Sequence, residues 1–267
     1  MTLSNQQSNS QSSNSSSEPN PELSILVPVY NEGATIAEIL RRLLDLPLSA
    51  RIIVIDNGST DNTADQILAF EGDLRLVYLY YDEIQGKGAA LRAGLTIARG
   101  EYVVVQDGDL EYDPADIVRM LKFAQENSLD AVFGSRILNP QAGVSYQRFY
   151  WGGRLLTWLA NQLFDVGITD EATCYKMVRR RLLMSLNLEC ERFEFCPEVV
   201  AKLGLLGIEI RELPIYYKPR SIDEGKKIRW SDGVEAIWTL VKWALRGEKL
   251  VRSSATTSAP APKKKTK

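Results

Sequence analysis

Short apolar runs that read as strands alternate with amphipathic runs that read as helices through the first half of this chain, and this alternation restricts the fold more than any other feature. Strands are expected at residues 23–29, 51–56, 74–79, 102–105 and 131–133. Helical spacing is expected over 34–44, 63–70 and 88–98, and Asp113 followed by Pro114 is typical of a further helix start. Strands separated by helices predict an α/β fold with a mostly parallel sheet and helices on both faces.

The two ends of the chain depart from this pattern. Residues 1–21 are rich in Ser, Asn and Gln, and residues 251–267 form a basic end with consecutive lysines. Such segments bury too little apolar surface to offset their ordering entropy, so both are predicted to be disordered tails. Residues 22–250 are expected to form one domain, with no internal repeat. The regularity weakens after residue 135, which suits an acceptor-binding half built onto a nucleotide-binding half.

Composition excludes several classes of function. A net charge of −2 gives no basic field for nucleic acid. Three cysteines without a CxxC pair, and no histidine, argue against a zinc site and a disulfide framework. No apolar run reaches the roughly 18 residues of a membrane span. The chain is therefore expected to be cytoplasmic, either soluble or peripheral at the cytosolic face of a membrane.

Three polar clusters follow expected strands, at residues 28–32, 56–61 and 106–111. Ligands of open α/β sheets bind beyond the carboxyl ends of the strands, so these clusters are expected to meet at one edge. In the third cluster, Asp107 and Asp109 flank Gly108, where the backbone can approach a ligand closely. Their carboxylates repel each other unless a cation lies between them. With Glu111 as third ligand, these hard oxygens favour Mg²⁺ or Mn²⁺ shared with a diphosphate.

The segment 86–88 opens the helix expected after the third strand with the sequence Gly-Lys-Gly. It resembles part of a phosphate loop but lacks the full motif. Lys87 is expected to stabilise phosphate charge, and the alternative is a plain helix start with an exposed lysine.

Together these residues resemble the family 2 glycosyltransferases of GT-A fold, a Rossmann-like three-layer fold, and within them the polyprenyl-phosphate sugar synthases typified by dolichyl-phosphate mannosyltransferase. The resemblance covers residues 22–248. It is carried by segments 27–32, 56–61, 86–90, 107–110, 134–136, 217–220 and 224–227. Departures from the family pattern are Asn57 for a second aspartate, Glu111 for glutamine, and the triplet 174–176, Cys-Tyr-Lys, for Gly-Phe-Lys.

The resemblance implies roles for named residues. The base and ribose of the nucleotide would be held by residues at the ends of the first two strands, namely Pro28, Tyr30, Glu32, Ile55 and Asp56. Further contacts to the nucleotide sugar would come from Asn57, Lys87 and Gly108, while Asp107, Asp109 and Glu111 would surround the metal. Three cations would face the donor diphosphate or the acceptor phosphate: Arg136, Arg220 and Lys226. The catalytic set would be Asp107, Asp109, Arg136 and Arg220.

The implied reaction is inverting transfer of a hexose to a polyprenyl or dolichyl phosphate, with GDP-mannose as the first expectation for the donor and UDP-glucose as the second. A lipid monophosphate is largely ionised at neutral pH and needs cations but no general base. A saccharide hydroxyl would need a base, for which Asp170 or Glu171 is the candidate. A third reading is a nucleotide-sugar-binding module without activity, against which the intact acidic and basic residues argue.

Two apolar segments rich in aromatic residues, 151–164 and 232–246, could each lie at a membrane interface or pack in the core. The expected partners are therefore a nucleotide sugar, a polyprenyl phosphate and a membrane surface, with room for a membrane-protein partner.

Overall fold

The computed structural model describes residues 21–143, 147–220 and 230–254. Its strands are β1 (Leu23–Val29), β2 (Ala50–Asn57), β3 (Leu76–Tyr81), β4 (Tyr102–Val105), β5 (Ala131–Ser135), β6 (Lys176–Arg179) and β7 (Ile210–Pro214). Its helices are α1 (Ile36–Leu44), α2 (Thr63–Leu68), α3 (Lys87–Ile97), α4 (Ala115–Glu126), α5 (Gln147–Phe164), α6 (Arg180–Ser185), α7 (Phe195–Leu205) and α8 (Trp230–Ser254).

The seven strands form one sheet in the order β3-β2-β1-β4-β6-β5-β7. The pairs β1·β2, β1·β4, β2·β3 and β5·β7 are parallel, whereas β6 runs antiparallel to both β4 and β5. The prediction of a mostly parallel sheet is confirmed. Strands β6 and β7 were not predicted. Strand β6 has only two apolar residues, Met177 and Val178, between charged ones, and β7 is a partly exposed edge strand that carries charged side chains.

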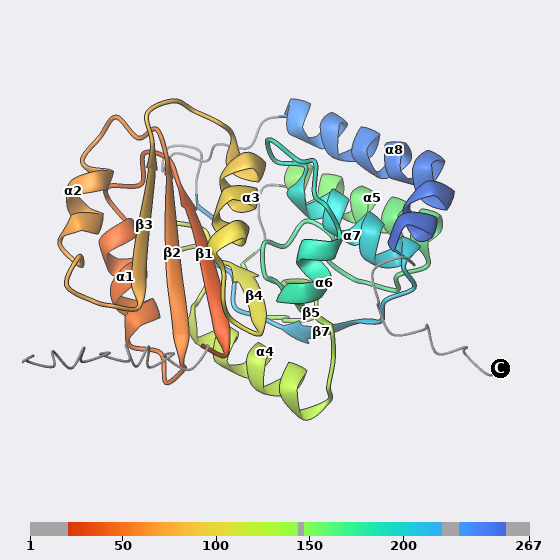
Figure 1. Cartoon of the computed structure of the whole chain (residues 1–267). Helices are drawn as coiled ribbons and strands as arrows, with labels where there is room; N and C mark the ends of the chain where they lie inside the picture. The colour runs from red at the N-terminus through yellow and green to blue at the C-terminus, as the bar shows by residue number, and fades with distance from the viewer. Residues whose placement is uncertain (1–20, 144–146, 221–229, 255–267) are drawn as a thin grey trace, which may run out of the picture.

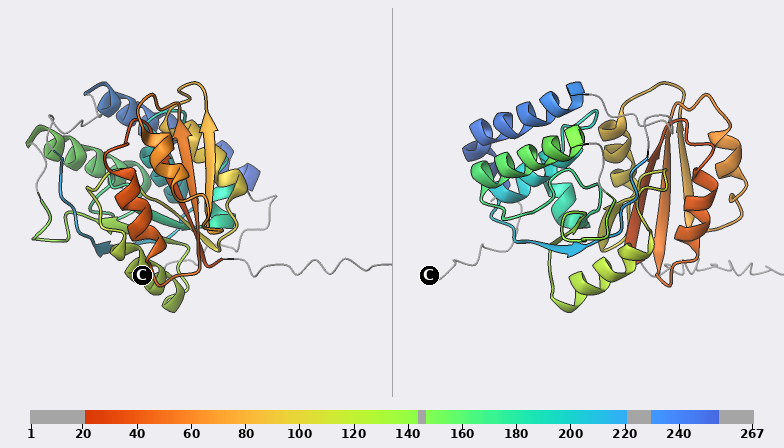
Figure 2. Two further views of the ribbon diagram at one scale, coloured as in Figure 1. Left: turned by 90° about the vertical axis from the view of Figure 1, so that its left-hand side faces the viewer. Right: turned by 180° about the vertical axis from the view of Figure 1, so that it is seen from behind.

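Helices cover both faces of the sheet, so the domain has three layers (Figures 1 and 2). Alternate residues of β1 show how the sheet separates two cores. Ile25 and Val27 pack with residues of α1 and α4, whereas Leu26 packs with residues of α3, α7 and α8. All three side chains are at most 1% exposed. A strand buried on both faces is what a continuous apolar run in a parallel sheet predicts.

The starts of β3 and α4 lie one or two residues later than predicted, because a turn containing an aspartate precedes each of them. Strand β3 begins at Leu76, two residues later than expected, because the carboxylate of Asp73 accepts the Arg75 N–H at 2.9 Å and closes a turn. Leu74 is consequently 91% exposed. Helix α4 begins at Ala115, whose N–H is accepted by the Asp113 carboxylate at 3.0 Å, as expected of a capping side chain.

Most of the two segments predicted as disordered tails lies outside the described residues. Helix α8 extends to Ser254, past residue 251, where the second tail was predicted to begin. Within the described residues no helix is long and apolar enough to cross a membrane. Cys174, Cys190 and Cys196 are free thiols.

Candidate active site

The carboxyl ends of β1 and β2 lie side by side and bring together several predicted donor-binding residues. Pro28 is in register with Ile55, and Val29 with Asp56. Tyr30 and Glu32 follow directly on β1 and are partly buried. The residues assigned to the base and ribose are therefore neighbours at one edge of the sheet.

Asp56 and Asn57 are more enclosed than the sequence suggested. The Asp56 side chain is fully buried, and its two oxygens accept the Ser59 N–H at 2.9 Å and the Tyr78 hydroxyl at 3.1 Å. Asn57 Oδ1 accepts the Gln85 N–H at 2.7 Å. Both side chains thus fix the loops that follow β2 and β3, and through these loops they shape the edge.

Gly108 lies where β1 and the acidic run come closest. A Cβ atom at Gly108 would stand 2.8 Å from Cγ1 of Val29 and 3.3 Å from Cγ of Glu32, closer than ordinary contact allows. The Thr35 hydroxyl also donates to the Gly108 carbonyl at 2.8 Å. The sequence predicted that a ligand approaches the backbone closely at Gly108. In this structure the residues at the end of β1 approach it closely.

Lys87 and Asp107 form an ion pair of 2.5 Å between the start of α3 and the end of β4. Burial disfavours both charges, but their attraction outweighs it, so the pKa of Asp107 is lowered and the pKa of Lys87 is raised. A plain helix start with an exposed lysine does not describe this geometry. The ammonium of Lys87 lies at the acidic run, and its role toward a phosphate stays a prediction.

The backbone at the start of α3 is used by the protein itself. The N–H groups of Gly88 and Ala89 donate to the carbonyls of Arg192 and Glu191, at 2.8 and 3.0 Å. Helix N-termini bind phosphate through such free N–H groups. In the segment 86–88, the side chain of Lys87 could therefore bind a phosphate as in a phosphate loop. The N–H groups of Gly88 and Ala89 are already used by the protein.

Arg220, in the segment after β7, joins three parts of the chain. Its guanidinium lies 2.6 Å from Oδ2 of Asp109 and 3.2 Å from Oε2 of Glu32. Its backbone N–H donates to Oε1 of Glu111 at 2.8 Å. The structure thereby brings one predicted cation to the acidic run and to the end of β1.

The predicted set of three metal ligands is not assembled in this structure. Across the residues that the structure describes, no three His, Cys, Asp or Glu side chains are grouped to hold an ion. The oxygens of Glu111 accept the Tyr217 hydroxyl, at 3.0 Å, and the Arg220 N–H. Burial and the neighbouring Asp107 raise the pKa of Asp109 to about 7.

The chemistry of the remaining oxygens nevertheless fits a hard divalent cation. Mg²⁺ is typically bound by one or two carboxylates together with substrate phosphates and water. Asp107 and Asp109 supply those two carboxylates beside Lys87 and Arg220. The donor set therefore fits an ion shared with a diphosphate better than an ion held by protein alone.

Arg136, after β5, is bound by Asp170. Its Nε and one Nη each lie 2.7 Å from an Asp170 oxygen, and its guanidinium lies 5.0 Å from the Tyr217 ring centre. Although burial would raise the pKa of Asp170, Arg136 holds it below its usual value. Glu171 is 1% exposed, burial raises its pKa, and its Oε1 has no hydrogen-bond partner. Asp170, the first of the two candidate bases, is therefore already engaged.

Three polar residues of the site were not singled out from the sequence: Thr35, Tyr78 and Tyr217. Each joins elements that are distant in sequence, and Tyr217 connects Arg136 to Glu111. The segment 217–220 carried the family resemblance, but no local pattern predicted which carboxylate its tyrosine would meet. The predicted cation Lys226 lies outside the described residues.

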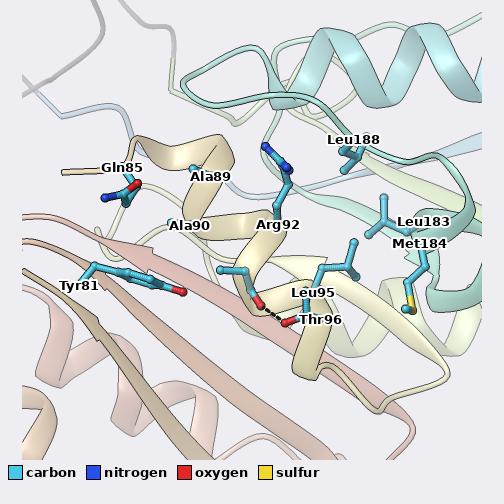
Figure 3. A pocket seen from close by; sticks show the side chains of 11 residues that line it. Tyr81, Gln85, Ala89, Ala90, Arg92, Leu95, Thr96, Leu183, Met184 and Leu188 are labelled. Carbon is cyan, nitrogen blue, oxygen red and sulfur yellow. Dashed lines mark hydrogen bonds between the residues drawn. The ribbon is translucent and has the colours of Figure 1, made fainter. Parts of the chain in front are cut away.

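A separate pocket of about 490 Å³ lies along the outer face of α3 (Figure 3). It is lined mainly by apolar side chains of α3 and of the 183–188 segment, with Arg92 as its charged residue. Gln85 lies at its lining two residues before Lys87. None of the site residues predicted from the sequence contributes to this pocket.

The fold and the acidic edge together define a glycosyltransferase of the GT-A type. Residues 24–186 match the family described as Glycosyl transferase family 2, and the chain belongs to that family. It is similar to the dodecaprenyl-phosphate galacturonate synthase of Rhizobium johnstonii, with 31% identity over 67% of this chain and 54% of the relative. The chain thus spans about half the length of that relative.

A second relative is similar over nearly its whole length. The polyprenol monophosphomannose synthase of Mycolicibacterium smegmatis is 27% identical over 86% of this chain and 89% of its own. Among solved structures, glucosyl-3-phosphoglycerate synthase from Mycobacterium tuberculosis, in complex with Mn²⁺ and UDP, aligns with a TM-score of 0.63. Its identity is 20%, over 84% of this chain and 80% of that one, so this likeness concerns the fold.

Proposed function

We propose that the protein transfers one hexose from a nucleotide sugar to a polyprenyl phosphate, with inversion at the anomeric carbon. The observation that carries this proposal is the linked pair of arginines, Arg136 and Arg220, joined through Tyr217 and Glu111 beside the acidic run. Arg220 lies at the acidic run, where the leaving diphosphate would bind. Arg136 is then available for a second anion, the acceptor phosphate. Both relatives named above carry a polyprenyl group in their names, which supports a lipid acceptor.

The two candidate bases, Asp170 and Glu171, distinguish a hydroxyl acceptor from a phosphate acceptor. Transfer to a hydroxyl requires a group that removes its proton. Asp170 is engaged by Arg136 through both oxygens, and Glu171 is enclosed in the interior. A phosphate oxygen needs no such group, because it is already charged at neutral pH. An acceptor phosphate therefore fits these residues better than a saccharide hydroxyl.

In the proposed step, an oxygen of the lipid phosphate attacks the anomeric carbon. A new carbon–oxygen bond forms as the bond to the nucleoside diphosphate breaks, and no proton is transferred. Lys87 and Arg220 stabilise the charge that develops on the leaving diphosphate. Arg136 uses two of its nitrogens for Asp170, and the rest of its five N–H donors can bind the acceptor phosphate. Lys226 is proposed to assist Arg136.

A divalent cation, Mg²⁺ or Mn²⁺, held by Asp107 and Asp109 would neutralise further charge on the diphosphate. In place of the expected role as third metal ligand, Glu111 is proposed to hold Tyr217 and Arg220 at this place. The nucleoside would lie along Pro28, Ile55 and the loop fixed by Asp56.

For the donor we propose GDP-mannose, with UDP-glucose as the alternative. The relative that is covered almost completely is named for mannose, which favours the first. The solved structure with UDP has a similar fold, which keeps the second open. The two relatives are named for different sugars but both for a polyprenyl group, so the donor of this chain is less constrained by them than its acceptor.

The test is a matrix of donors and acceptors. The purified chain with Mn²⁺ is incubated with GDP-mannose, UDP-glucose or UDP-galacturonate, each with a short polyprenyl phosphate, the matching polyprenol, or a disaccharide. We expect product with the phosphate alone and from one donor, which identifies the sugar. Glycosylation of the polyprenol or the disaccharide, without product on the phosphate, would refute the proposed acceptor.

A further inference from the structure

Four of the five tryptophans of this protein are exposed to solvent. Trp151, Trp158, Trp230 and Trp238 are 67%, 58%, 83% and 63% exposed, whereas Trp243 is 2% exposed. Tryptophan is highly buried on average, and contiguous exposed apolar surface marks interaction sites. All four exposed tryptophans lie on two helices, α5 and α8.

Helical spacing gathers these side chains into two stripes. One stripe of α5 carries Trp151, Leu155 and Trp158, at intervals of four and three residues, and all three are at least 50% exposed. Helix α8 carries a longer stripe made of Trp230, Val234, Trp238 and Leu245, all at least 56% exposed. At 1.5 Å per residue the α8 stripe is roughly 22 Å long.

The opposite faces of the same helices pack into the domain. Ala160 of α5 is fully buried, and so is Leu240 of α8. Both belong to the core between the sheet and these helices. For the segments 151–164 and 232–246, packing in the core is therefore found for one face of each helix. The opposite, exposed face of each helix is free for the second interpretation, a membrane interface. The exposed stripes add nothing to the core.

The two helices are neighbours on the same side of the sheet. They contact each other and run side by side from the sheet outward, as the views in Figures 1 and 2 agree. Helix α8 begins at the level of the carboxyl ends of β1, β2 and β3 (top of Figure 1). We call the seven stripe residues, Trp151, Leu155, Trp158, Trp230, Val234, Trp238 and Leu245, the tryptophan surface.

Charges around the tryptophan surface are arranged for an anionic partner. The α5 sequence contains no Asp or Glu, and Arg154 is exposed beside its stripe. In α8, Asp232 is 7% exposed, and Glu235, whose side chain is 34% exposed, lies 3.9 Å from Arg192. Among the side chains that the structure describes, the one partly exposed carboxylate beside the stripes is therefore paired with an arginine.

We infer that the tryptophan surface binds the interfacial layer of an anionic phospholipid bilayer. Indole rings prefer the interface between hydrocarbon and headgroups, and helices with one apolar face lie in that plane. The inference rests on the proposed function, because a polyprenyl phosphate is held in a bilayer while its phosphate is at the headgroup level. A surface that binds the bilayer would keep the chain at the layer that holds the lipid phosphate.

The test uses the full chain and two vesicle compositions, pure phosphatidylcholine and a mixture with phosphatidylglycerol. We expect cosedimentation with the mixture and quenching of tryptophan fluorescence by lipids brominated near the headgroup. The double variant Trp158→Glu/Trp238→Glu should bind at least tenfold more weakly. Leu74→Glu, which changes a 91% exposed leucine outside the tryptophan surface, should bind like the wild type. Circular dichroism verifies that all three proteins are folded.

Two results would overturn the inference. One is equal vesicle binding by the double variant and the wild type, or no binding by either. The other is a dimer that the double variant dissociates in light scattering while vesicles bind neither protein, since the surface would then join two copies of the chain.

Activity separates this inference from the proposed function. On a short, water-soluble prenyl phosphate the double variant should match the wild type, and on a long-chain acceptor in vesicles it should be at least tenfold slower. If the wild type used no polyprenyl phosphate at all, the proposed function would fail, and vesicle binding alone would decide the inference.

Discussion

The guanidinium of Arg220 lies 2.6 Å from Asp109, so a residue beyond the last strand of the sheet neutralises part of the acidic run that follows β4. The same side chain also reaches Glu32, after β1. One arginine therefore links the segments that follow β1, β4 and β7. The contact holds these segments, far apart in the sequence, at the edge where the proposed diphosphate would bind.

Replacing Arg220 tests this arrangement. Arg220→Gln should lower kcat/KM about 100-fold, because hydrogen bonds to charged groups contribute about 1.5–3 kcal/mol each. Arg220→Lys should recover only part of the loss, since a lysine cannot bind Glu32 and Asp109 as a fork. Arg41→Gln, which alters an exposed ion pair on α1, is the matched control. Wild-type kinetics in Arg220→Gln would contradict the assigned role.

Metal removal should abolish transfer, and either Mg²⁺ or Mn²⁺ should restore it. In Asp107→Asn the metal concentration for half-maximal activity should rise about tenfold, because one charged ligand is lost. In Glu111→Gln it should stay close to the wild-type value, since the oxygens of Glu111 serve Tyr217 and Arg220. A metal titration of both variants distinguishes the two positions. The reverse order would make Glu111 the stronger ligand.

The pH dependence of transfer should separate a positioning residue from a base. We expect the rate to rise with pH between about 6, the second pKa of the acceptor phosphate, and about 7, the pKa of Asp109, because both groups act in their deprotonated forms. Asp170→Asn should raise KM for the acceptor about tenfold by releasing Arg136, with this profile unchanged. Glu171→Gln should remain near wild type. Loss of the pH dependence in either variant would instead favour a hydroxyl acceptor.

Gly108→Ala should damage the site directly. The added methyl group meets Val29 at 2.8 Å, and such overpacking costs about 1–3 kcal/mol. Activity should fall by more than this loss of stability explains, because the acidic run must shift. Gly72→Ala, with nothing within 4 Å of the new Cβ, should stay within about 0.5 kcal/mol of the wild type. Denaturant unfolding and steady-state kinetics measure the two effects.

A buried ion pair in α7 should matter for stability. Lys202 lies 2.6 Å from Glu198, which also accepts the N–H groups of Glu189 and Cys190. Lys202→Met should cost about 3–5 kcal/mol, because it leaves a buried carboxylate without its partner. Adding Glu198→Gln removes the unpaired charge but turns an NH₂ group toward the N–H of Glu189 or Cys190, so the combined loss in thermal unfolding should be smaller than the sum of the two single losses without returning to the wild-type value. Purely additive losses would show that the two side chains are not coupled.

The sequence predicts the donor half of this fold well, because its signals are local. Strand β1 alternates so that Ile25 and Val27 face one core, and the acidic residues follow buried strands directly. The features that were missed depend on pairing between distant segments. Strand β6 has only two apolar residues between charged ones, unlike the equally short β4, and nothing local shows that it runs antiparallel between β4 and β5.

For the candidate site, too, local features were predicted from the sequence and contacts between distant segments were not. Polar residues after the strands predicted which side chains would meet at one edge of the sheet, whereas the ion pair of Lys87 with Asp107 was not predicted. The sequence did not show that Asp170 would be occupied by Arg136, nor that Glu111 would face Tyr217. Both contacts join segments after different strands, and their geometry depends on packing that no spacing rule encodes.

The ion pair between Arg220 and Glu32 spans 188 residues of sequence. A chain that is still being synthesised therefore displays its acidic edge long before the arginine that balances it emerges. Contacts of such separation form late, because the entropy of closing the loop must first be overcome. A nascent chain that stops short of residue 220 would lack the arginine that meets Glu32 and Asp109, so these two carboxylates would stay without that partner until residue 220 has emerged.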